Sequence, residues 1–126
     1  MRIDIKADQN KEGFFTVIPH ASIDADSHDD FRNHLHPILN KSTKGILIDL
    51  KEVNYISSAG LGVLFSVNQL MKENKGTLLF CHLKPQIEKL FDVVKVLPKE
   101  NQFKSIEEAD LFFYAIMNKE IKKQAK

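Results

Sequence analysis

The sequence predicts a single α/β domain, with a mixed β-sheet of about four to five strands and about four helices packed against it. Short apolar runs alternate with amphipathic segments along the chain. Two of these runs, residues 45–50 and 77–82, are apolar almost throughout, which is typical of strands covered on both faces. The length of 126 residues is that of one domain with its own core.

The N-terminal third predicts a β-hairpin followed by a helix. Apolar and polar residues alternate from Ile3, a polar stretch interrupts the pattern, and residues 14–18 resume an apolar run rich in β-formers. A helix is expected after Ser27, because two aspartates follow in its first turn, where carboxylates stabilise the positive end of the dipole. Pro37 should bend or interrupt this helix, since proline lacks an amide hydrogen and clashes with the preceding turn.

The middle of the chain predicts a strand, a helix and a second strand. Residues 45–50 are placed at the centre of the sheet, and residues 77–82 form another buried strand. The helix between them begins near Ser58 and ends near Gly76, a residue that suits a helix stop. Its broad apolar stripe consists of Leu61, Leu64, Phe65, Val67, Leu70 and Met71.

Two more helices are expected in the C-terminal third. The first covers residues 84–94 and carries a proline in its first turn, where proline is tolerated. A short strand around Lys95 to Leu97 and a polar turn then lead to a last helix from about Ile106. The residues expected to dock this helix on the sheet are Leu111, Phe112, Ala115 and Ile116. The domain is assigned to residues 1–118, and residues 119–126 are expected to form a polar, frayed end.

Composition limits the classes of function. The chain has 18 Lys plus Arg against 17 Asp plus Glu, a net charge of +1, so no bulk field draws it toward nucleic acid or a membrane. Its single cysteine, Cys81, excludes an intramolecular disulfide and fits a reducing compartment, so a cytoplasmic location is expected. No apolar run approaches the roughly 20 residues that span a bilayer, and the first residues lack the pattern of a signal peptide.

A run of two serines, an alanine and Gly-Leu-Gly precedes the central helix; we call Ser57 to Gly62 the serine loop. Residues 46–103 resemble the STAS domain of bacterial anti-sigma factor antagonists, and the resemblance covers nearly the whole protein. It is carried by the strand with Asp49, the serine loop, the Leu64/Phe65 helix, the Gly76 turn, the "LFDVV" helix and an early "ASID" turn, Ala21 to Asp24.

The resemblance implies a binding module controlled by phosphorylation, without catalytic residues of its own. Such proteins bind an anti-sigma factor serine kinase when unphosphorylated and thereby free a sigma factor. Phosphorylation of one serine releases the kinase, and a serine phosphatase resets the state. In the family's loop the phosphorylated serine follows an aspartate; the matching residue here is Ser58, while Ser57 replaces the aspartate and is the alternative acceptor.

The serine loop also suits this role physically. A serine before a helix can accept hydrogen bonds from unpaired amides, and the same amides and dipole can hold a phosphate. Phosphorylation adds roughly −1.5 to −2 charges, so it should remove a docked partner and leave the fold intact. Leu61 should anchor the loop in the core, and the glycines should let the partner approach. The expected partner-binding residues are Ser57, Ser58, Ala59, Gly60, Gly62 and Asp24.

Other interpretations of the same residues remain open. The serine can be a helix cap only, in a STAS scaffold or a subunit of a transport or lipid-trafficking assembly. A small-molecule enzyme or sensor would instead use a pocket near Asp24 and Ser58. Thermal-shift screening would separate the classes, because a ligand that binds the native state stabilises it.

No cofactor or metal site is predicted. Gly60 to Gly62 is too short for a dinucleotide fingerprint and lacks the lysine of a P-loop. The acidic turn from Asp24 lacks the glycine and glutamate of a calcium-binding EF-hand. His34 and His36 are two residues apart, so a helix would point them to different sides. Cys81 lies within an apolar strand and is expected to pack in the core.

Overall fold

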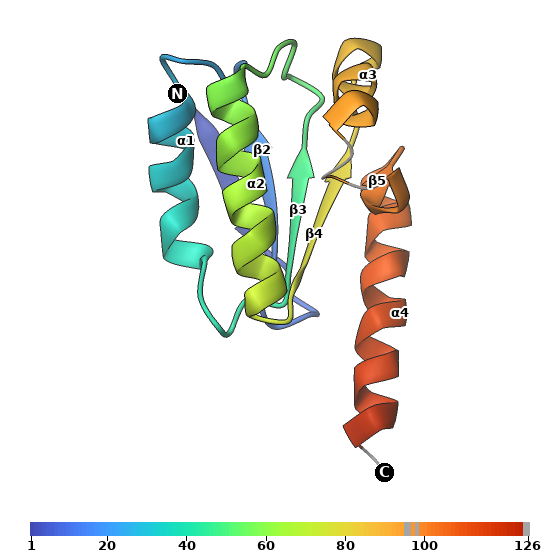
Figure 1. The fold of residues 1–126 in the computed structure, drawn as a ribbon. Coiled ribbons are helices and arrows are strands. Elements are labelled where there is room, and N and C mark those ends of the chain that lie inside the picture. Colours follow the sequence, from blue (N-terminus) through green and yellow to red (C-terminus); the bar gives the residue numbers. More distant parts are fainter. Residues whose placement is uncertain (95–96, 98, 125–126) are drawn as a thin grey trace.

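A computed structural model describes the backbone of residues 1–94, 97 and 99–124. Within them the chain forms a five-stranded mixed sheet in the order β1-β2-β3-β4-β5, with four α-helices (Figure 1), which confirms the predicted fold class. The strands are β1 (Ile3–Ala7), β2 (Phe14–Pro19), β3 (Gly45–Asp49), β4 (Thr77–Cys81) and β5 (Gln102–Phe103). The helices are α1 (His28–Leu35), α2 (Ser58–Glu73), α3 (Pro85–Val94) and α4 (Ile106–Gln124), with short 3-10 turns at His36–Ile38 and Lys99–Asn101.

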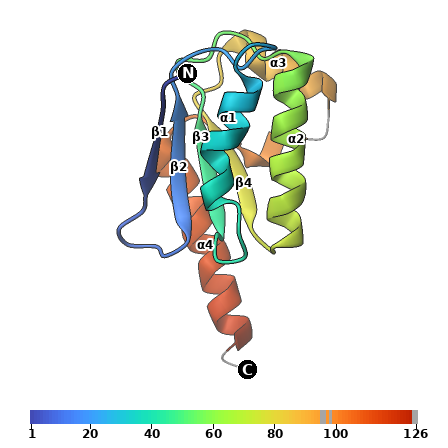
Figure 2. The ribbon, with the colours of Figure 1, turned by 90° about the vertical axis from the view of Figure 1, so that its left-hand side faces the viewer.

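Strand direction decides where the loops gather. The N-terminal hairpin pairs β1 and β2 antiparallel, as predicted, and β2, β3, β4 and β5 are parallel to one another. The central position of β3 is also confirmed. α1 connects β2 to β3, and α2 connects β3 to β4. Both connections lead to the next strand on the same side and both are right-handed crossovers, so α1 and α2 lie on the same face of the sheet. They lie side by side in both ribbon views (Figure 1 and Figure 2), and the carboxyl ends of the parallel strands share one edge.

The sheet separates two apolar cores. The larger core lies under α1, α2 and α3 and contains Val17, Ile46, Ile48, Phe31, Leu64, Phe80 and Phe91, among others. The smaller core lies under α4 and contains Phe14, Leu47, Leu79, Cys81, Ala109 and Phe113. All five residues of β3 are buried, because helices cover both of its faces. The buried, nearly continuous apolar sequence of this strand is thereby explained.

The predicted helix boundaries hold at two prolines and need one correction. α1 ends at Leu35 and continues as a 3-10 turn through Pro37, and α3 begins at Pro85. α2 ends at Glu73, but the left-handed residue behind it is Lys75, with φ of 59°, and not Gly76. Gly76 is required for close packing instead. A β-carbon there would lie 2.7 Å from Met71 Cε and 3.1 Å from the carbonyl oxygen of Thr43.

Two expectations for the C-terminal third change. The strand expected at Lys95 to Leu97 falls partly outside the described residues, and Leu97 itself lies in a bend; a strand missed by the sequence analysis, β5, forms at Gln102–Phe103. The docking face of α4 was also misassigned, because the helix is turned so that Ala109 and Phe113 are buried while Leu111 is 70% exposed and Ala115 is exposed. Phe112 is partly buried against the smaller core, as predicted. No helix in the described ranges is both long and apolar enough to cross a membrane.

A buried lysine fastens α4 to the hairpin. Lys11 is only 2% exposed, and its Nζ lies 3.3 Å from both Asp8 Oδ2 and Asp110 Oδ1. The same ammonium lies 4.4 Å from the centre of the Tyr114 ring, an arrangement that attracts a cation to the aromatic face. Beside it, the Phe14 and Phe113 rings pack edge to face, 4.8 Å apart. The attachment of α4 therefore combines apolar burial with a charge held by two carboxylates.

Candidate functional site

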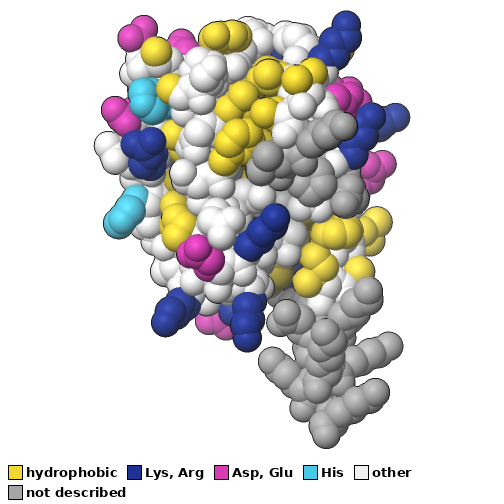
Figure 3. Space-filling model, in the orientation of Figure 1, with side chains coloured by type: hydrophobic (Ala, Val, Ile, Leu, Met, Phe, Trp, Pro, Cys, Tyr) yellow, Lys and Arg dark blue, Asp and Glu magenta, His cyan; other side chains and the backbone are white. Residues whose placement is uncertain are grey.

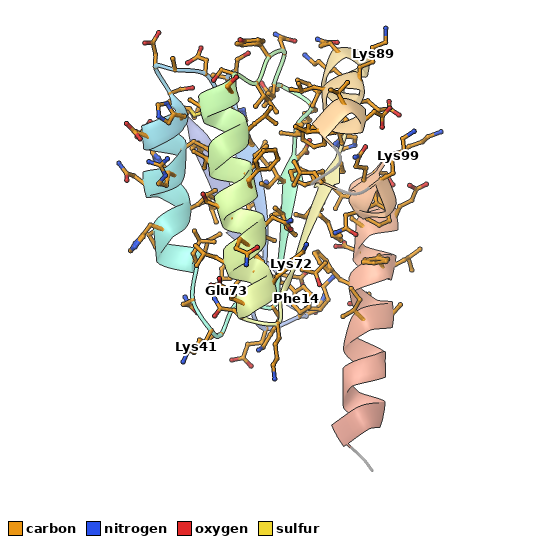
Figure 4. The ribbon with its side chains drawn as sticks, viewed as in Figure 1. Phe14, Lys41, Lys72, Glu73, Lys89 and Lys99 are labelled. Atoms are coloured by element: carbon orange, nitrogen blue, oxygen red, sulfur yellow. The ribbon has the colours of Figure 1, made fainter. Side chains whose placement is uncertain are left out.

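The serine loop lies at the carboxyl ends of the parallel strands, between β3 and α2. Three segments meet at this end of the molecule: the turn between β2 and α1, the connection from β3 to α2, and the start of α3 (Figure 1). Lys89 of α3 lies at the same end, whereas Lys72 and Glu73, at the close of α2, lie at the opposite end (Figure 4). The site is therefore built from loops carried on a rigid sheet.

One side of the β3–α2 connection is tied to the turn that follows β2. The Ile23 amide donates to the Tyr55 carbonyl at 3.0 Å, and the Ser57 amide donates to the Ile23 carbonyl at 2.9 Å. These bonds make a parallel bridge between Ile23 and Ile56, both of which are buried. The Tyr55 amide also donates to Ser22 Oγ at 3.1 Å. The acidic turn and the serine loop, 33 or more residues apart in sequence, thus form one surface.

The other side of the connection is held by the start of α3 and by Lys84, the residue before it. Lys84 Nζ donates to Asn54 Oδ1, and Gln86 Nε2 donates to the Asn54 carbonyl at 3.2 Å. Between the two attachments the Tyr55 side chain is 59% exposed. The backbone leading into α2 is therefore fixed from both sides, while an aromatic side chain next to it stays open to solvent.

The two adjacent serines have different environments. Ser57 is the N-cap of α2: its backbone is extended, with φ of −78° and ψ of 173°, and its Oγ accepts the Gly60 amide at 3.1 Å. Its carbonyl accepts the Leu61 amide at 2.8 Å. Ser58 begins the helix and is exposed, and its hydroxyl has no hydrogen-bond partner among the described residues. The capping role thus belongs to Ser57 and leaves the Ser58 hydroxyl unengaged.

The two glycines of the loop also differ, and the expectation for Gly60 needs correction. A β-carbon on Gly60 would lie 2.4 Å from the Ile23 carbonyl oxygen, so this buried glycine faces the molecule's own backbone and not a partner. Gly62 is exposed, and a β-carbon there would meet nothing within 4 Å. Leu61 is buried in the larger core, as predicted, and Ala59 is half-buried.

Asp24 builds the turn before α1. Its Oδ1 accepts the amides of Asp26 at 2.9 Å and Ser27 at 3.0 Å, together with the Ser27 hydroxyl at 3.2 Å. These hydrogen bonds hold the pKa of the Asp24 carboxyl below its usual range, and the bond from the Asp26 amide has the largest effect. α1 begins directly after Ser27, as predicted; the Ser27 side chain makes no cap bond, and its Oγ donates to the Ser22 carbonyl at 2.8 Å. Asp24 therefore places a fixed negative charge in the segment that adjoins the serine loop.

An exposed stripe continues from the serine loop along α2. Ser58, Gly62, Ser66 and Gln69 follow one another at intervals of three or four residues and are all exposed, so they share one helix face. Farther along the helix lies a shallow groove of about 460 Å³, lined by Phe65, Ser66, Gln69, Leu70 and Glu73. Hydrophobic side chains also gather on the surface between α2 and α3 (Figure 3). A protein bound at Ser58 could therefore extend over a mixed polar and apolar surface.

The residues weighed for metal and nucleophile chemistry are also placed. His34 Nδ1 lies 2.8 Å from the Asp30 carbonyl on α1, and no described cluster of metal-ligating groups includes His34 or His36. Cys81 is buried in β4, as expected, and desolvation raises the pKa of its thiol to about 12, which does not suit a nucleophile. His82, which follows it, was not singled out from the sequence, although it contacts a buried carboxylate of β3.

Comparison with known proteins gives consistent matches. The sequence pattern of the STAS domain matches residues 6–109. BtrV of Bordetella bronchiseptica, whose name places it among the anti-sigma factor antagonists, is 34% identical over 55 residues; the match spans 44% of this chain and 47%, about half, of BtrV. The anti-sigma-B factor antagonist of Bacillus subtilis is 30% identical over 93 residues, which are 74% of this chain and 84% of that protein.

Solved structures share the fold at low sequence identity. A Thermotoga maritima structure named for an anti-sigma factor antagonist superimposes with a TM-score of 0.76 at 18% identity, over 85% of this chain and 90% of that one. Phosphorylated SpoIIAA of Bacillus gives 0.69 at 12% identity, over 86% and 96%. A domain of the murine anion transporter Slc26a9 gives 0.70 at 16% identity, over 83% of this chain and 18% of the transporter.

Proposed function

Because the chain belongs to the STAS domain family, we propose that it is an anti-sigma factor antagonist controlled by phosphorylation. The unphosphorylated protein binds an anti-sigma factor serine kinase and frees a sigma factor. Phosphorylation at Ser58 releases the kinase, and a serine phosphatase restores the binding form. The proposed module acts in the cytoplasm, catalyses no reaction, needs no cofactor for its switch, and contacts neither nucleic acid nor membrane directly.

The observation that carries this proposal is that the Ser57 hydroxyl caps α2 while the Ser58 hydroxyl is free of hydrogen bonds to the described residues. A serine that caps a helix engages its hydroxyl in a structural hydrogen bond, as Ser57 does with the Gly60 amide. The Ser58 hydroxyl is exposed, one residue farther along the chain, where a kinase could reach it. Modification of Ser58 would leave the cap and the bridge from Ile23 to Ile56 in place.

A phosphate on Ser58 would leave the fold intact and weaken the binding of a partner. It would stand in the first turn of α2, where exposed amides and the helix dipole favour an anion and no acidic side chain competes. A partner packed against the neutral stripe from Ser58 to Gln69 would meet roughly −1.5 to −2 additional charges at its edge. Phosphorylation would therefore release the partner without unfolding the domain.

The proposed contact surface consists of the exposed part of the serine loop and its neighbours. Ser57, Ser58 and Ala59 form its centre, and Gly62 keeps the following turn free of side chains. The carboxylate of Asp24 lies in the adjoining turn. Gly60 supports this surface from inside the molecule and does not form part of it.

Phosphopeptide mapping tests the acceptor. The protein is purified from its own cells, with and without phosphatase treatment, and its intact mass is measured before mapping. A phosphatase-sensitive phosphate on Ser58 supports the proposal, and a phosphate on Ser57 keeps the switch but moves the acceptor. Absence of phosphate under several growth conditions favours a scaffold without a switch.

Charge substitution tests release. Ser58→Asp should weaken capture of the kinase from lysates of the same cells, whereas Ser58→Ala should capture it and resist release by ATP. Ser42→Asp is the matched control. Ser42 is exposed and lies before β3, at the amino-terminal ends of the parallel strands, whereas Ser58 lies at their carboxyl ends. Equal capture by Ser58→Asp and Ser58→Ala would remove Ser58 from the mechanism.

The fold similarity to Slc26a9 supports a second candidate, a STAS scaffold or subunit of a transport or lipid-trafficking assembly. This candidate requires a stable partner that is not a kinase. Its association should be unchanged by Ser58→Ala and by Ser58→Asp, so the same capture experiment separates the two functions.

A further inference from the structure

A second cluster of chemically active side chains lies at the carboxyl ends of β3 and β4, outside the proposed contact surface. Asp49 and Cys81 are register partners across the two strands, and both side chains are buried. Asp49 Oδ1 lies 2.9 Å from His82 Nδ1, which in turn lies 3.7 Å from Cys81 Sγ. One ligand atom from each of the three residues lies within 4.8 Å of the other two.

The backbone at His82 brings the third side chain to this cluster. Successive side chains of a strand normally point to opposite faces, so His82 would be expected on the side opposite Cys81. His82 instead has a left-handed conformation, with φ of 57°, which is uncommon for a residue other than glycine. Its imidazole therefore turns toward Asp49, and its side chain also lines a cavity of about 410 Å³ that opens to solvent.

The Asp49 carboxylate has an unused buried oxygen. Its side chain is 0% exposed, and Oδ2 has no hydrogen-bond partner among the described residues. Oδ1 accepts the Lys51 amide at 3.1 Å in addition to its contact with His82. The Lys51 ammonium lies 3.5 Å from Oδ2 on a half-exposed side chain, so it offsets part of the charge from the solvent side. A buried carboxylate oxygen without a hydrogen bond is costly unless a cation binds it.

We propose that Asp49, Cys81 and His82 form a binding site for a divalent transition metal of the zinc class. One carboxylate, one thiolate and one imidazole make a donor set that suits Zn²⁺, whereas Mg²⁺ and Ca²⁺ prefer oxygen donors alone. In tetrahedral zinc geometry, nitrogen and sulfur ligands are about 3.6 Å apart, close to the 3.7 Å between His82 Nδ1 and Cys81 Sγ. Three protein ligands leave the fourth position of a tetrahedral site to a water molecule.

Binding of the metal has a defined proton balance. Cys81 binds as the thiolate, so its thiol proton leaves to solvent, and the positive charge of the metal stabilises the sulfur anion that burial otherwise disfavours. His82 binds through Nδ1 as the neutral imidazole, so the proton that Nδ1 shares with Asp49 Oδ1 in the metal-free site passes to solvent, the ring is protonated on Nε2, and the metal bond replaces this hydrogen bond. Asp49 supplies a carboxylate oxygen as the third protein ligand. The contact of Lys51 with the carboxylate is then replaced by the stronger charge of the metal.

Titration of the folded, chelator-treated full chain with Co²⁺ tests the site. Cys81 is the only cysteine of the chain, so a near-ultraviolet band from sulfur-to-cobalt charge transfer reports this residue alone. We expect the band to saturate at one Co²⁺ per chain and Zn²⁺ to displace it. Cys81→Ala should abolish the band. His82→Asn should lower the affinity at least about tenfold, because it removes a direct ligand.

Matched variants keep the test specific. Asn tolerates a left-handed backbone, so His82→Asn preserves the local conformation. His34→Asn is the control, because His34 is a histidine on α1 outside the cluster, and it should bind Co²⁺ as the parent chain does. Circular dichroism confirms folding before each titration. The parent titration depends on no variant: absence of a sulfur-to-cobalt band overturns the site, and so does equal affinity of His82→Asn and His34→Asn.

Discussion

Gly60 lies against Ile23 so closely that a methyl group on its α-carbon would stand 2.4 Å from the Ile23 carbonyl oxygen. That oxygen accepts the Ser57 amide in the bridge between the two loops, so it cannot move without breaking a hydrogen bond. Gly60→Ala should therefore lower the free energy of unfolding by about 1–3 kcal/mol. Gly62→Ala, in the same helix but in open space, should raise it by up to about 1 kcal/mol through helix propensity. Urea unfolding measures both, and equal effects would show that Gly60 has no packing role.

Substitution of Ser57 and of Ser58 by alanine should change the free energy of unfolding by different amounts, because only Ser57 makes a capping hydrogen bond. Ser57→Ala removes the acceptor of the Gly60 amide and should cost about 0.5–2 kcal/mol of unfolding free energy. Ser58→Ala removes an exposed hydroxyl and should change it by less than about 0.5 kcal/mol. Thermal and urea unfolding of both variants provide the measurement. The reverse ranking would assign the helix cap to Ser58 and weaken the case for it as the phosphorylated residue.

Asp24 should make part of the stability depend on pH in the acid range. Its pKa is lowered in the folded protein by the Asp26 and Ser27 amides, so its stabilising contribution is complete above the unfolded-state pKa. This contribution is lost as the pH falls through the folded-state pKa. The advantage of the parent chain over Asp24→Asn should therefore shrink below about pH 4. Asn retains an acceptor oxygen but cannot ionise; an advantage that is constant from pH 7 to pH 3 would contradict this account.

Lys11 should control the attachment of α4. Lys11→Met leaves the carboxylates of Asp8 and Asp110 without their shared cation and should lower the unfolding free energy by about 2 kcal/mol. Both carboxylates are partly exposed, so solvent screens the loss and keeps it below that of a fully buried pair. Hydrogen exchange should accelerate in α4 more than in β3. Lys41→Met, at an exposed lysine near the same end of the molecule (Figure 4), is the control and should change neither quantity.

Most of the architecture could be predicted because it depends on periodic burial. The nearly continuous apolar run of β3, the broad stripe of α2 and the prolines near the end of α1 and the start of α3 each have one physical interpretation. β5 was missed because two residues, one of them the polar Gln102, carry no periodic pattern. The docking face of α4 was misassigned because apolar residues occur on more than one side of the helix, and only packing against Phe14 selects Phe113.

The site was predictable in composition and not in orientation. Sequence order identified two serines and two glycines, yet which serine caps α2 and which glycine faces inward depend on the approach of Ile23 from a distant turn. The arrangement of Asp49 with His82 had no sequence signal, because a left-handed histidine and a cross-strand register cannot be read from residue types. Contacts that join separate segments are set by topology, so they appear only when the strands are placed.

The direction of α4 has a practical consequence. This helix leaves β5 and runs away from the edge that carries the serine loop, toward the far end of the molecule (Figure 1). A dye, a surface tether or a fused reporter attached after α4 would therefore lie far from a protein bound at Ser58. Single-molecule or immobilised assays can hold the domain by that end and leave the opposite end facing the solution.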